Sequence, residues 1–486
     1  ASNTTGLGYG ALRDNTTGAS NTAVGRLSLA TNTTGASNTA VGLDSLLSNT
    51  TGTENTSVGD SSSDANTTGS YNTALGRNSL GGNTTASHNT AIGRLAMLTN
   101  STGASNTAVG SGALQSNTTA ANNTAVGANA LVSNTTGTQN TIIGSRAGDA
   151  LTTASYNTAV GERSLSADTL GSRNVAIGNL TLNAQNFTSA TDSYNVAVGY
   201  GAGTAVTTGI QNVLIGGTTG DALTDADWNV AIGTGALSTD TLGSGSTAIG
   251  HSALNAQNFT SATTTYNTAV GYLAGNAVTT GTHNTFIGGL SGDANTTGYY
   301  NVAVGASALS ANTTAISNTA VGYSALAANT TGATNTAVGY ASLDANTTGA
   351  ANTALGNAAL GANTTANANT GIGNAALGAN TTGTSNSAVG SGALAANTTA
   401  SRSTALGYNS LAANTTGANN TAVGDGSLSG NTTGANNVAF GLGSLEANTT
   451  ADNNTAVGYK ALLANTTGSV NTALGSNALT ANTTGV

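Results

Sequence analysis

Residues 19–35 read ASNTAVGRLSLATNTTG, and the next seventeen, residues 36–52, read ASNTAVGLDSLLSNTTG. The pattern continues along the chain. Twenty-eight units, twenty-six of 17 residues and two of 21, cover all 486 residues except one at each end. A short fixed period predicts a stack of equal supersecondary units, none of which can bury its apolar face alone. We therefore expect residues 1–486 to form a single continuous solenoid.

When the unit is numbered from Ala19, position 7 is Gly in every copy, as at Gly25, Gly42, Gly59 and Gly76. A Gly held at one phase predicts a turn that needs a positive φ or a close approach of two backbones. We expect these glycines to form one structural turn that recurs in each coil.

The apolar residues recur at positions 4, 6 and 11. Position 4 is usually Thr or Val, and position 6 is Val, Ile or Leu except at Phe440. A strand with these two positions facing inward is therefore expected, with the small Ala of position 5 facing outward. Position 11, usually Leu, predicts a second apolar strand. The expected core includes Val24, Val41, Leu29 and Leu46.

Each coil is thus expected to run strand, Gly turn, strand and Asn-rich turn, which predicts an all-β, parallel β-solenoid or β-roll of about 28 coils. A helical repeat is disfavoured by the many β-branched residues and glycines.

Two columns of Asn accompany this pattern. Asn21 and Asn38 occupy position 3, and Asn32 and Asn49 occupy position 14. Stacked amides form hydrogen-bonded ladders in cross-β assemblies, so we expect Asn ladders along the axis. The alternative is glycosylation, because N-x-T acceptor sequences recur at position 14. The candidate acceptors are Asn32, Asn49, Asn66 and Asn83.

A larger duplication covers residues 138–281, in which a 72-residue block occurs twice. Each copy contains one unit with four extra residues, and the stretch LNAQNFTSAT is identical in both. Insertions in solenoids form loops on one face. Phe187 and Phe259 therefore mark candidate contact loops, the alternative being that each ring folds back over its coil.

Composition excludes several classes of function. Only 6% of residues are charged, and nine basic residues with a net charge of −9 argue against nucleic acid as a partner. There is no Cys, and no apolar run has the length of a membrane span. Neither end differs from the middle, so we expect part of a longer protein or a protomer that docks end to end.

The sequence offers no catalytic constellation. His88, His251 and His283 fall in different units, and the carboxylates are scattered. Triads and metal sites need side chains that converge within a few ångströms. We expect no enzyme activity, no metal and no cofactor.

The NTAVGxxALxxNTTG pattern resembles the NTAVG repeat arrays of bacterial surface and phage tail-fibre-like proteins. It is also similar to the head repeats of trimeric autotransporter adhesins, whose motif is close to SVAIGxxAxA. The resemblance covers nearly the whole chain and implies a left-handed parallel β-roll, often trimeric, on an extracellular fibre or adhesin. The period of 17 residues is longer than that of the adhesin heads.

Three functions follow as hypotheses. The first is an extracellular, cell-surface filament or fibre stalk that self-associates, end to end or as a homotrimer, through the Ala column of position 5. The second is a surface adhesin or tail-fibre shaft that binds glycans or cell surfaces through its Tyr columns and Phe loops. The third is ice binding, which needs outward Thr-x-Thr columns. It ranks low because Thr33 and Thr34 are adjacent and position 4 is expected to face inward.

Overall fold

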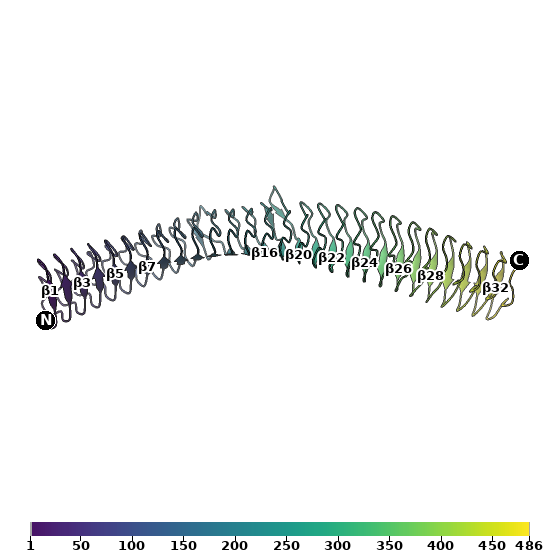
Figure 1. The fold of residues 1–486 in the computed structure, drawn as a ribbon, viewed down its shortest axis with the longest axis horizontal. Coiled ribbons are helices and arrows are strands. Elements are labelled where there is room, and N and C mark those ends of the chain that lie inside the picture. Colours follow the sequence, from purple (N-terminus) through teal and green to yellow (C-terminus); the bar gives the residue numbers. More distant parts are fainter. Residues whose placement is uncertain (1, 486) are drawn as a thin grey trace. The chain divides into compact units, whose positions relative to one another are not determined.

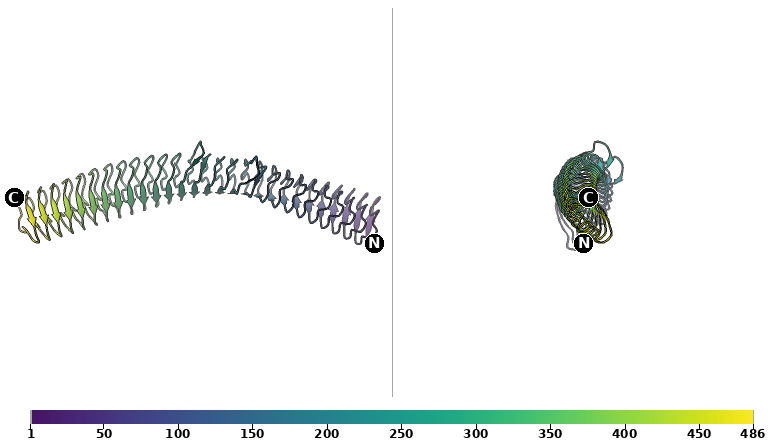
Figure 2. Two further views of the ribbon diagram at one scale, coloured as in Figure 1. Left: turned by 180° about the vertical axis from the view of Figure 1, so that it is seen from behind. Right: turned by 90° about the vertical axis from the view of Figure 1, so that its right-hand side faces the viewer.

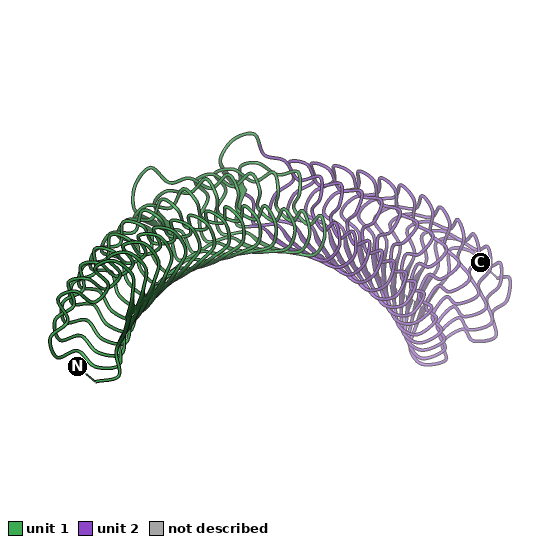
Figure 3. Ribbon diagram, turned by 60° about the vertical axis from the view of Figure 1, so that its left-hand side comes forward, with its two compact units in different colours: residues 1–245, 260–263 green, residues 246–259, 264–486 purple. Residues whose placement is uncertain are grey.

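The computed structural model describes residues 2–485, and all regular structure within them is β. The chain is a parallel β-solenoid of about 28 turns, with one turn for each repeat. It divides into two compact units (Figure 3): unit 1 runs to residue 245 and includes residues 260–263, and unit 2 comprises residues 246–259 and those from 264 onward. The described residues contain no helix long and apolar enough to cross a membrane.

Unit 1 contains one three-residue strand in each coil, and Figure 1 shows these strands side by side in chain order. Equivalent residues of successive repeats pair with each other, as Thr22 does with Thr39 and Val24 with Val41. In the 21-residue coil Val175 pairs with Val196, so the loop absorbs the four extra residues and the strands stay in register. The three-residue strands are β1 (Thr5–Leu7), β2 (Thr22–Val24), β3 (Thr39–Val41), β4 (Thr56–Val58), β5 (Thr73–Leu75), β6 (Thr90–Ile92), β7 (Thr107–Val109), β8 (Thr124–Val126), β9 (Thr141–Ile143), β10 (Thr158–Val160), β12 (Val175–Ile177), β14 (Val196–Val198), β15 (Val213–Ile215) and β16 (Val230–Ile232). The two-residue strands are β11 (Gly171–Ser172), β13 (Thr191–Asp192) and β17 (Gly243–Ser244).

Unit 2 has the same construction. Its strands pair in parallel with the next coil, as Thr319 does with Thr336. The two-residue strand β19 (Thr263–Thr264) has one residue in each unit. The strands are β18 (Thr247–Ile249), β20 (Thr268–Val270), β21 (Thr285–Ile287), β22 (Val302–Val304), β23 (Thr319–Val321), β24 (Thr336–Val338), β25 (Thr353–Leu355), β26 (Thr370–Ile372), β27 (Ser387–Val389), β28 (Thr404–Leu406), β29 (Thr421–Val423), β30 (Val438–Phe440), β31 (Thr455–Val457) and β32 (Thr472–Leu474).

The second strand expected around position 11 is absent from the described coils, which continue there as turns. Leu27 and Leu29 have φ of 56° and 52°, in the left-handed region. The backbone still bonds to neighbouring coils: Leu27 N–H donates to Tyr9 O at 2.8 Å and Leu29 N–H to Ser45 O at 2.9 Å. Inter-coil hydrogen bonding therefore extends beyond the strand, and it offsets the cost of the left-handed residues.

The two faces of the strand are the reverse of the expectation. Ala23 is fully buried, whereas Val24 and Val41 are partly exposed, so their assignment to the core is wrong. Leu29 and Leu46 are fully buried, as predicted. The Leu of position 11 fills the narrow interior of the coil and leaves room opposite it for a small residue only. The β-branched residues take the outward face of the strand, which suits their shape equally well.

The volume of side chains inside the coil is conserved where a large residue replaces the Ala of position 5. Ile142, Leu214 and Phe286 replace the usual Ala at intervals of 72 residues, and all three are fully buried. Position 11 of nearby coils is then Gly instead of Leu. A Cβ on Gly220 would lie 2.8 Å from Leu214 Cδ2, and one on Gly275 would lie 2.8 Å from Phe286 Cδ2. The exchange of large and small residues preserves close packing.

The Gly column is explained by its conformation and its neighbours. Gly25 and Gly42 have φ of 130° and 141°, a region closed to other residues. A Cβ on Gly42 would also lie 2.7 Å from the carbonyl carbon of Gly59 in the next coil. The repeated glycine allows both the turn and the close stacking of successive coils.

Both Asn ladders are present. At position 3, Asn21 Nδ2 donates to Gly35 O at 2.8 Å, and Asn38 N–H donates to Asn21 Oδ1 at 2.9 Å. At position 14, Asn49 Nδ2 donates to Asn32 Oδ1 at 2.7 Å, and Asn32 Nδ2 donates to Gly35 O at 2.9 Å. The amides thus satisfy buried polar groups within a coil and between coils.

Candidate functional surfaces

The outward face of the strands is at least partly exposed along both units. Positions 4 and 6 hold no charged residue in any unit. Thr22 and Val24 are each partly exposed, on either side of the buried Ala23. Ice binding was disfavoured partly because position 4 was expected to face inward. That expectation is wrong, because the Thr of position 4 faces outward. It alternates with Val, Ile, Leu or Phe, however, and not with a second Thr. The Ala column proposed for self-association is buried and cannot serve.

Large apolar side chains gather on and beside this face. Among the described residues, the exposed large apolar side chains lie at positions 2, 6 and 8, with the exceptions of Leu290, Tyr299 and Leu479. Positions 2 and 8 flank the strand at its two ends. Positions 4 and 6 form one uncharged strip that follows the coils of each unit, and its borders at positions 2 and 8 mix aromatic residues with charged ones such as Arg26, Asp60 and Arg173.

Planar side chains stack on one another at position 2 of unit 1. The rings of Tyr71 and His88 lie 4.9 Å apart and almost parallel, at 5°. The Arg173 guanidinium lies 4.6 Å from the ring centre of Tyr156 and 5.8 Å from that of Tyr194. Its Nε is 3.0 Å from a carboxylate oxygen of the exposed Asp192. Each Tyr ring in these groups thus has a planar side chain of a neighbouring coil beside it.

Unit 2 has aromatic stacks on both borders of the strip. At position 2, His283 lies 5.1 Å from Tyr266 and 5.0 Å from Tyr300, measured between ring centres. At position 8, Tyr323 and Tyr340 lie 5.5 Å apart at 14°. Each stack joins residues one coil apart. Side-chain stacking therefore reinforces the backbone ladder at the solvent-exposed edge.

The insertion in unit 1 does not present its aromatic ring to solvent. Phe187 is 5% exposed, and the exposed residues of the loop are Asn186, Thr188, Ser189 and Ala190. Figure 2 shows loops that rise above the neighbouring coils, as this one does. The expectation of a contact loop carried by Phe187 is wrong for the ring, which folds back over the coil and covers Gly171.

A buried acid fixes this loop. Asp168 takes the place of a ladder Asn, and its carboxylate accepts from Gln185 Nε2 at 2.7 Å, Gly171 N–H at 3.0 Å and Phe187 N–H at 3.4 Å. All three partners donate, so the site requires an acceptor at both oxygens. Burial raises the pKa of Asp168, and these hydrogen bonds oppose that rise. Gln185 in turn accepts from Asn195 Nδ2 at 2.9 Å.

The insertion in unit 2 is built alike. Phe259 is 7% exposed, so here too the ring is not available for contact. Gln257 Nε2 donates to Ser246 Oγ at 2.8 Å, and Asn267 Nδ2 donates to Gln257 Oε1 at 2.9 Å. A buried Gln therefore replaces the ladder Asn in both long coils.

The glycosylation hypothesis is wrong at position 14. Asn32, Asn49, Asn66 and Asn83 are at most 1% exposed, and the Nδ2 of each donates within its ladder. A sugar attached to such a nitrogen would replace a buried donor and has no room in the stacked coils. The recurring acceptor sequence is a by-product of the ladder.

The histidines do not converge. His88, His251 and His283 each pack against Tyr rings, and residues 2–485 contain no group of three acids or histidines arranged to hold a metal. Burial raises the pKa of the half-buried Asp221 and Asp293 at position 12, four coils apart.

One open hollow of about 620 Å³ lies in unit 2. It spans three successive coils, and its two charged residues are Glu446 and Lys460. The other lining residues are small or aliphatic, and they bring no nucleophile next to a base. The full lining is Ser429, Gly430, Glu446, Ala447, Lys460, Leu463 and Ala464.

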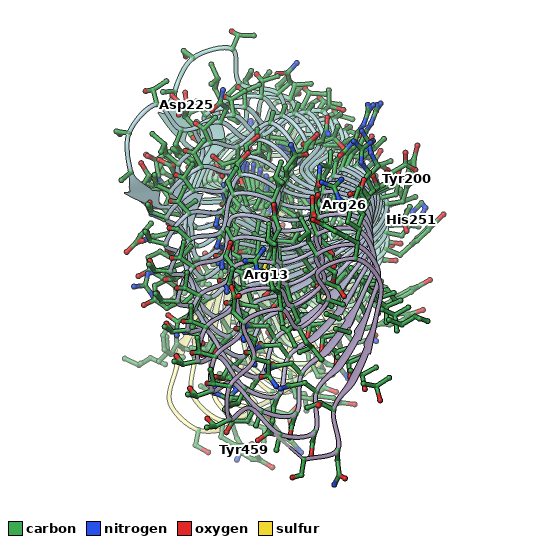
Figure 4. All side chains as sticks on the ribbon, turned by 90° about the vertical axis from the view of Figure 1, so that its left-hand side faces the viewer. Arg13, Arg26, Tyr200, Asp225, His251 and Tyr459 are labelled. Carbon is green, nitrogen blue, oxygen red and sulfur yellow. The ribbon has the colours of Figure 1, made fainter. Side chains whose placement is uncertain are left out.

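The stacking of Arg173 on Tyr156 at position 2 was not predicted from the pattern of a single unit. Figure 4 shows Tyr200, at position 8, and Asp225, at position 16, on opposite sides of the coil. A residue therefore has as neighbours along the axis the residues at the same position of adjacent coils. Comparing the same position in successive coils brings Tyr156, Arg173 and Tyr194 together. That comparison was the signal available in the sequence.

Comparison with protein-family models found no match to this chain, and comparison with curated protein sequences found no significant similarity.

Proposed function

We propose that this protein is a non-enzymatic structural protein of an extracellular or cell-surface fibre, which self-associates through the outward face of its strands. The observation that carries the proposal is the uninterrupted, uncharged strip at positions 4 and 6. Exposed apolar strips of this continuity mark interaction surfaces. The extracellular location rests on the resemblance to surface and fibre repeats.

A second copy of the chain is the partner that fits such a strip. Successive rows of the strip are one coil apart, because equivalent residues pair in register, as Ala40 pairs with Ser57. A partner must present groups at the same spacing to meet every row. An identical solenoid does so, and closed symmetric association of two or three copies covers the strip on each.

The test replaces exposed aliphatic residues of position 6 in unit 1. Ile143, Ile177 and Ile215 are 37–38% exposed. We expect the triple Ile→Lys variant to be monomeric by sedimentation equilibrium, while the unchanged chain forms dimers, trimers or filaments visible by electron microscopy. Lysines on this face bring like charges together and leave the core intact.

The matched control places three lysines at position 16, which is exposed and lies outside the strip. The triple variant Thr102→Lys, Thr119→Lys and Thr136→Lys is expected to associate like the unchanged chain. An unchanged chain that stays monomeric at every concentration, or a control that dissociates equally, overturns the proposal. Protease treatment of intact cells tests the location.

Adhesion to glycans is a second candidate, supported by the exposed tyrosines of position 8. Tyr200, Tyr272, Tyr323, Tyr340 and Tyr408 are 56–63% exposed. Tyr is suited to such surfaces because its ring is apolar and its hydroxyl is polar. Binding to a glycan array that is lost when these residues are changed to Ser supports adhesion.

A further inference from the structure

The two copies of the 72-residue block differ at the aromatic column of unit 1. In the first copy Arg173 lies on the ring of Tyr156 and pairs with Asp192. Seventy-two residues later the corresponding positions are Trp228, Gly245 and Thr264. The cation and the acid that holds it are therefore both replaced, while the aromatic residue is enlarged.

The backbone around the two positions is the same. Arg173 N–H donates to Ser155 O at 3.1 Å, and Gly245 N–H donates to Asp227 O at 2.9 Å. Their φ values, 65° and 71°, are also alike. Gly245 thus holds the place beside Trp228 that Arg173 holds beside Tyr156, but it brings no side chain.

Trp228 is 55% exposed, and its position is fixed by a hydrogen bond from Nε1 to Gln211 Oε1 at 2.8 Å. The second block also gains two acids, Asp225 and Asp227, where the first has Thr153 and Ser155. Asp225 Oδ1 accepts from the Thr208 hydroxyl at 2.6 Å.

The two acids carry negative charge without a cation of the chain beside them. Asp227 Oδ1 accepts from Ile210 N–H at 2.7 Å. Neither Asp225 nor Asp227 takes part in an ion pair among the described residues. Asp227 directly precedes Trp228 in the chain and Asp225 lies three residues before it, so their negative charge favours a cation over an anion near the exposed indole.

We propose that Trp228, Asp225 and Asp227 bind a guanidinium group from outside the chain, in the place that Arg173 occupies in the first block. A guanidinium is planar and weakly hydrated, so it stacks on an aromatic face while its N–H groups donate to carboxylates. In the first block Arg173 makes both kinds of interaction, stacking on Tyr156 and pairing with Asp192. The source is an arginine side chain of a partner or free arginine.

Trp228 is the single Trp of the chain, so its fluorescence reports on this site alone. N-acetyl-arginine amide is titrated against the full chain, with its neutral isostere N-acetyl-citrulline amide as the matched probe. We expect a saturable change with the arginine probe and binding about tenfold weaker or absent with citrulline, because only the former carries a cation. Free arginine, titrated separately, distinguishes the two sources: weaker binding than the amide, from repulsion of its carboxylate, indicates a side chain of a partner, and equal or tighter binding indicates the free amino acid.

Three variants complete the test. Gly245→Arg places a guanidinium of the chain itself beside Trp228 and is expected to abolish the response, whereas Gly245→Ser leaves the place open and should retain it. Both substitutions suit the backbone, because other residues of this column, such as Trp228 with φ of 58°, have similar conformations. The double variant Asp225→Asn, Asp227→Asn should lose the preference for the cation. Equal responses to both probes, no saturable response, or a full response in Gly245→Arg overturns the proposal.

Discussion

Two glycines in one coil of unit 2 differ in how strongly their backbone conformation and their neighbours require Gly. Gly424, at position 7, has φ of 130°, and a Cβ there would lie 2.6 Å from the carbonyl carbon of Gly441. Gly426, at position 9, has φ of 62°, and a Cβ there meets nothing within 4 Å. Ala341 and Ala358 occupy position 9 in other coils at φ of 47° and 50°. Gly424→Ala and Gly426→Ala are therefore a matched pair.

The expected magnitudes differ clearly. At Gly424, a backbone conformation closed to Ala costs about 1–3 kcal/mol, and overlap with the next coil adds about 1–3 kcal/mol. The total is about 2–6 kcal/mol. At Gly426, the left-handed conformation costs about 1–2 kcal/mol, and the reduced freedom of the unfolded chain returns about 0.4–1 kcal/mol. The net cost there is about 1 kcal/mol.

Hydrogen exchange is the appropriate assay, because a solenoid opens locally and global unfolding is not two-state. The amide of Gly441 donates to Val423 O at 2.7 Å, across the altered contact. We expect much faster exchange of this amide and its neighbours in Gly424→Ala, and nearly unchanged exchange in Gly426→Ala. Equal protection in the two variants would refute the argument that backbone contact between coils demands Gly at position 7.

Three further predictions concern the polar interior and the loop. Asn346→Ala removes donors to Asn329 Oδ1 and Gly349 O and an acceptor from Asn363; it should lower local opening free energy by about 2–4 kcal/mol, whereas exposed Asn357→Ala should change it by less than about 0.5 kcal/mol, both read by hydrogen exchange. Burial raises the pKa of Asp168, so the folded state binds a proton at this carboxylate more readily than the unfolded state does. Protonation of Asp168 should therefore add stability at low pH, and this contribution should be lost as the pH rises through the folded pKa. Asp168→Asn should remove that part of the pH profile of thermal unfolding. Phe187→Ala should cost about 3–5 kcal/mol locally and increase cleavage of the 188–190 loop by protease, an effect that uniform cleavage rates would contradict.

The solenoid could be predicted from the sequence because its evidence is the repeat itself. A fixed Gly, two fixed Asn columns and a recurring Leu require equivalent surroundings in every unit, and stacking provides them. For the same reason the ladders at Asn21 and Asn32 and the burial of Leu29 followed from the sequence. Each depends on residues at the same position of adjacent units, and their order is visible in the chain.

Only the tertiary structure decided which way the strand faces. Thr22 and Val24 have shapes that suit either side of a strand, so their alternation gives a period of two without its direction. The direction depends on the width of the coil, which is set by the turns: Leu29 adopts a left-handed conformation, fills the interior and leaves space only for Ala23. The hydrogen bond from the Phe187 N–H to Asp168, nineteen residues earlier in the chain, likewise depends on contacts between coils. A repeat determines that coils stack, whereas the space inside them is known only once the backbone is closed.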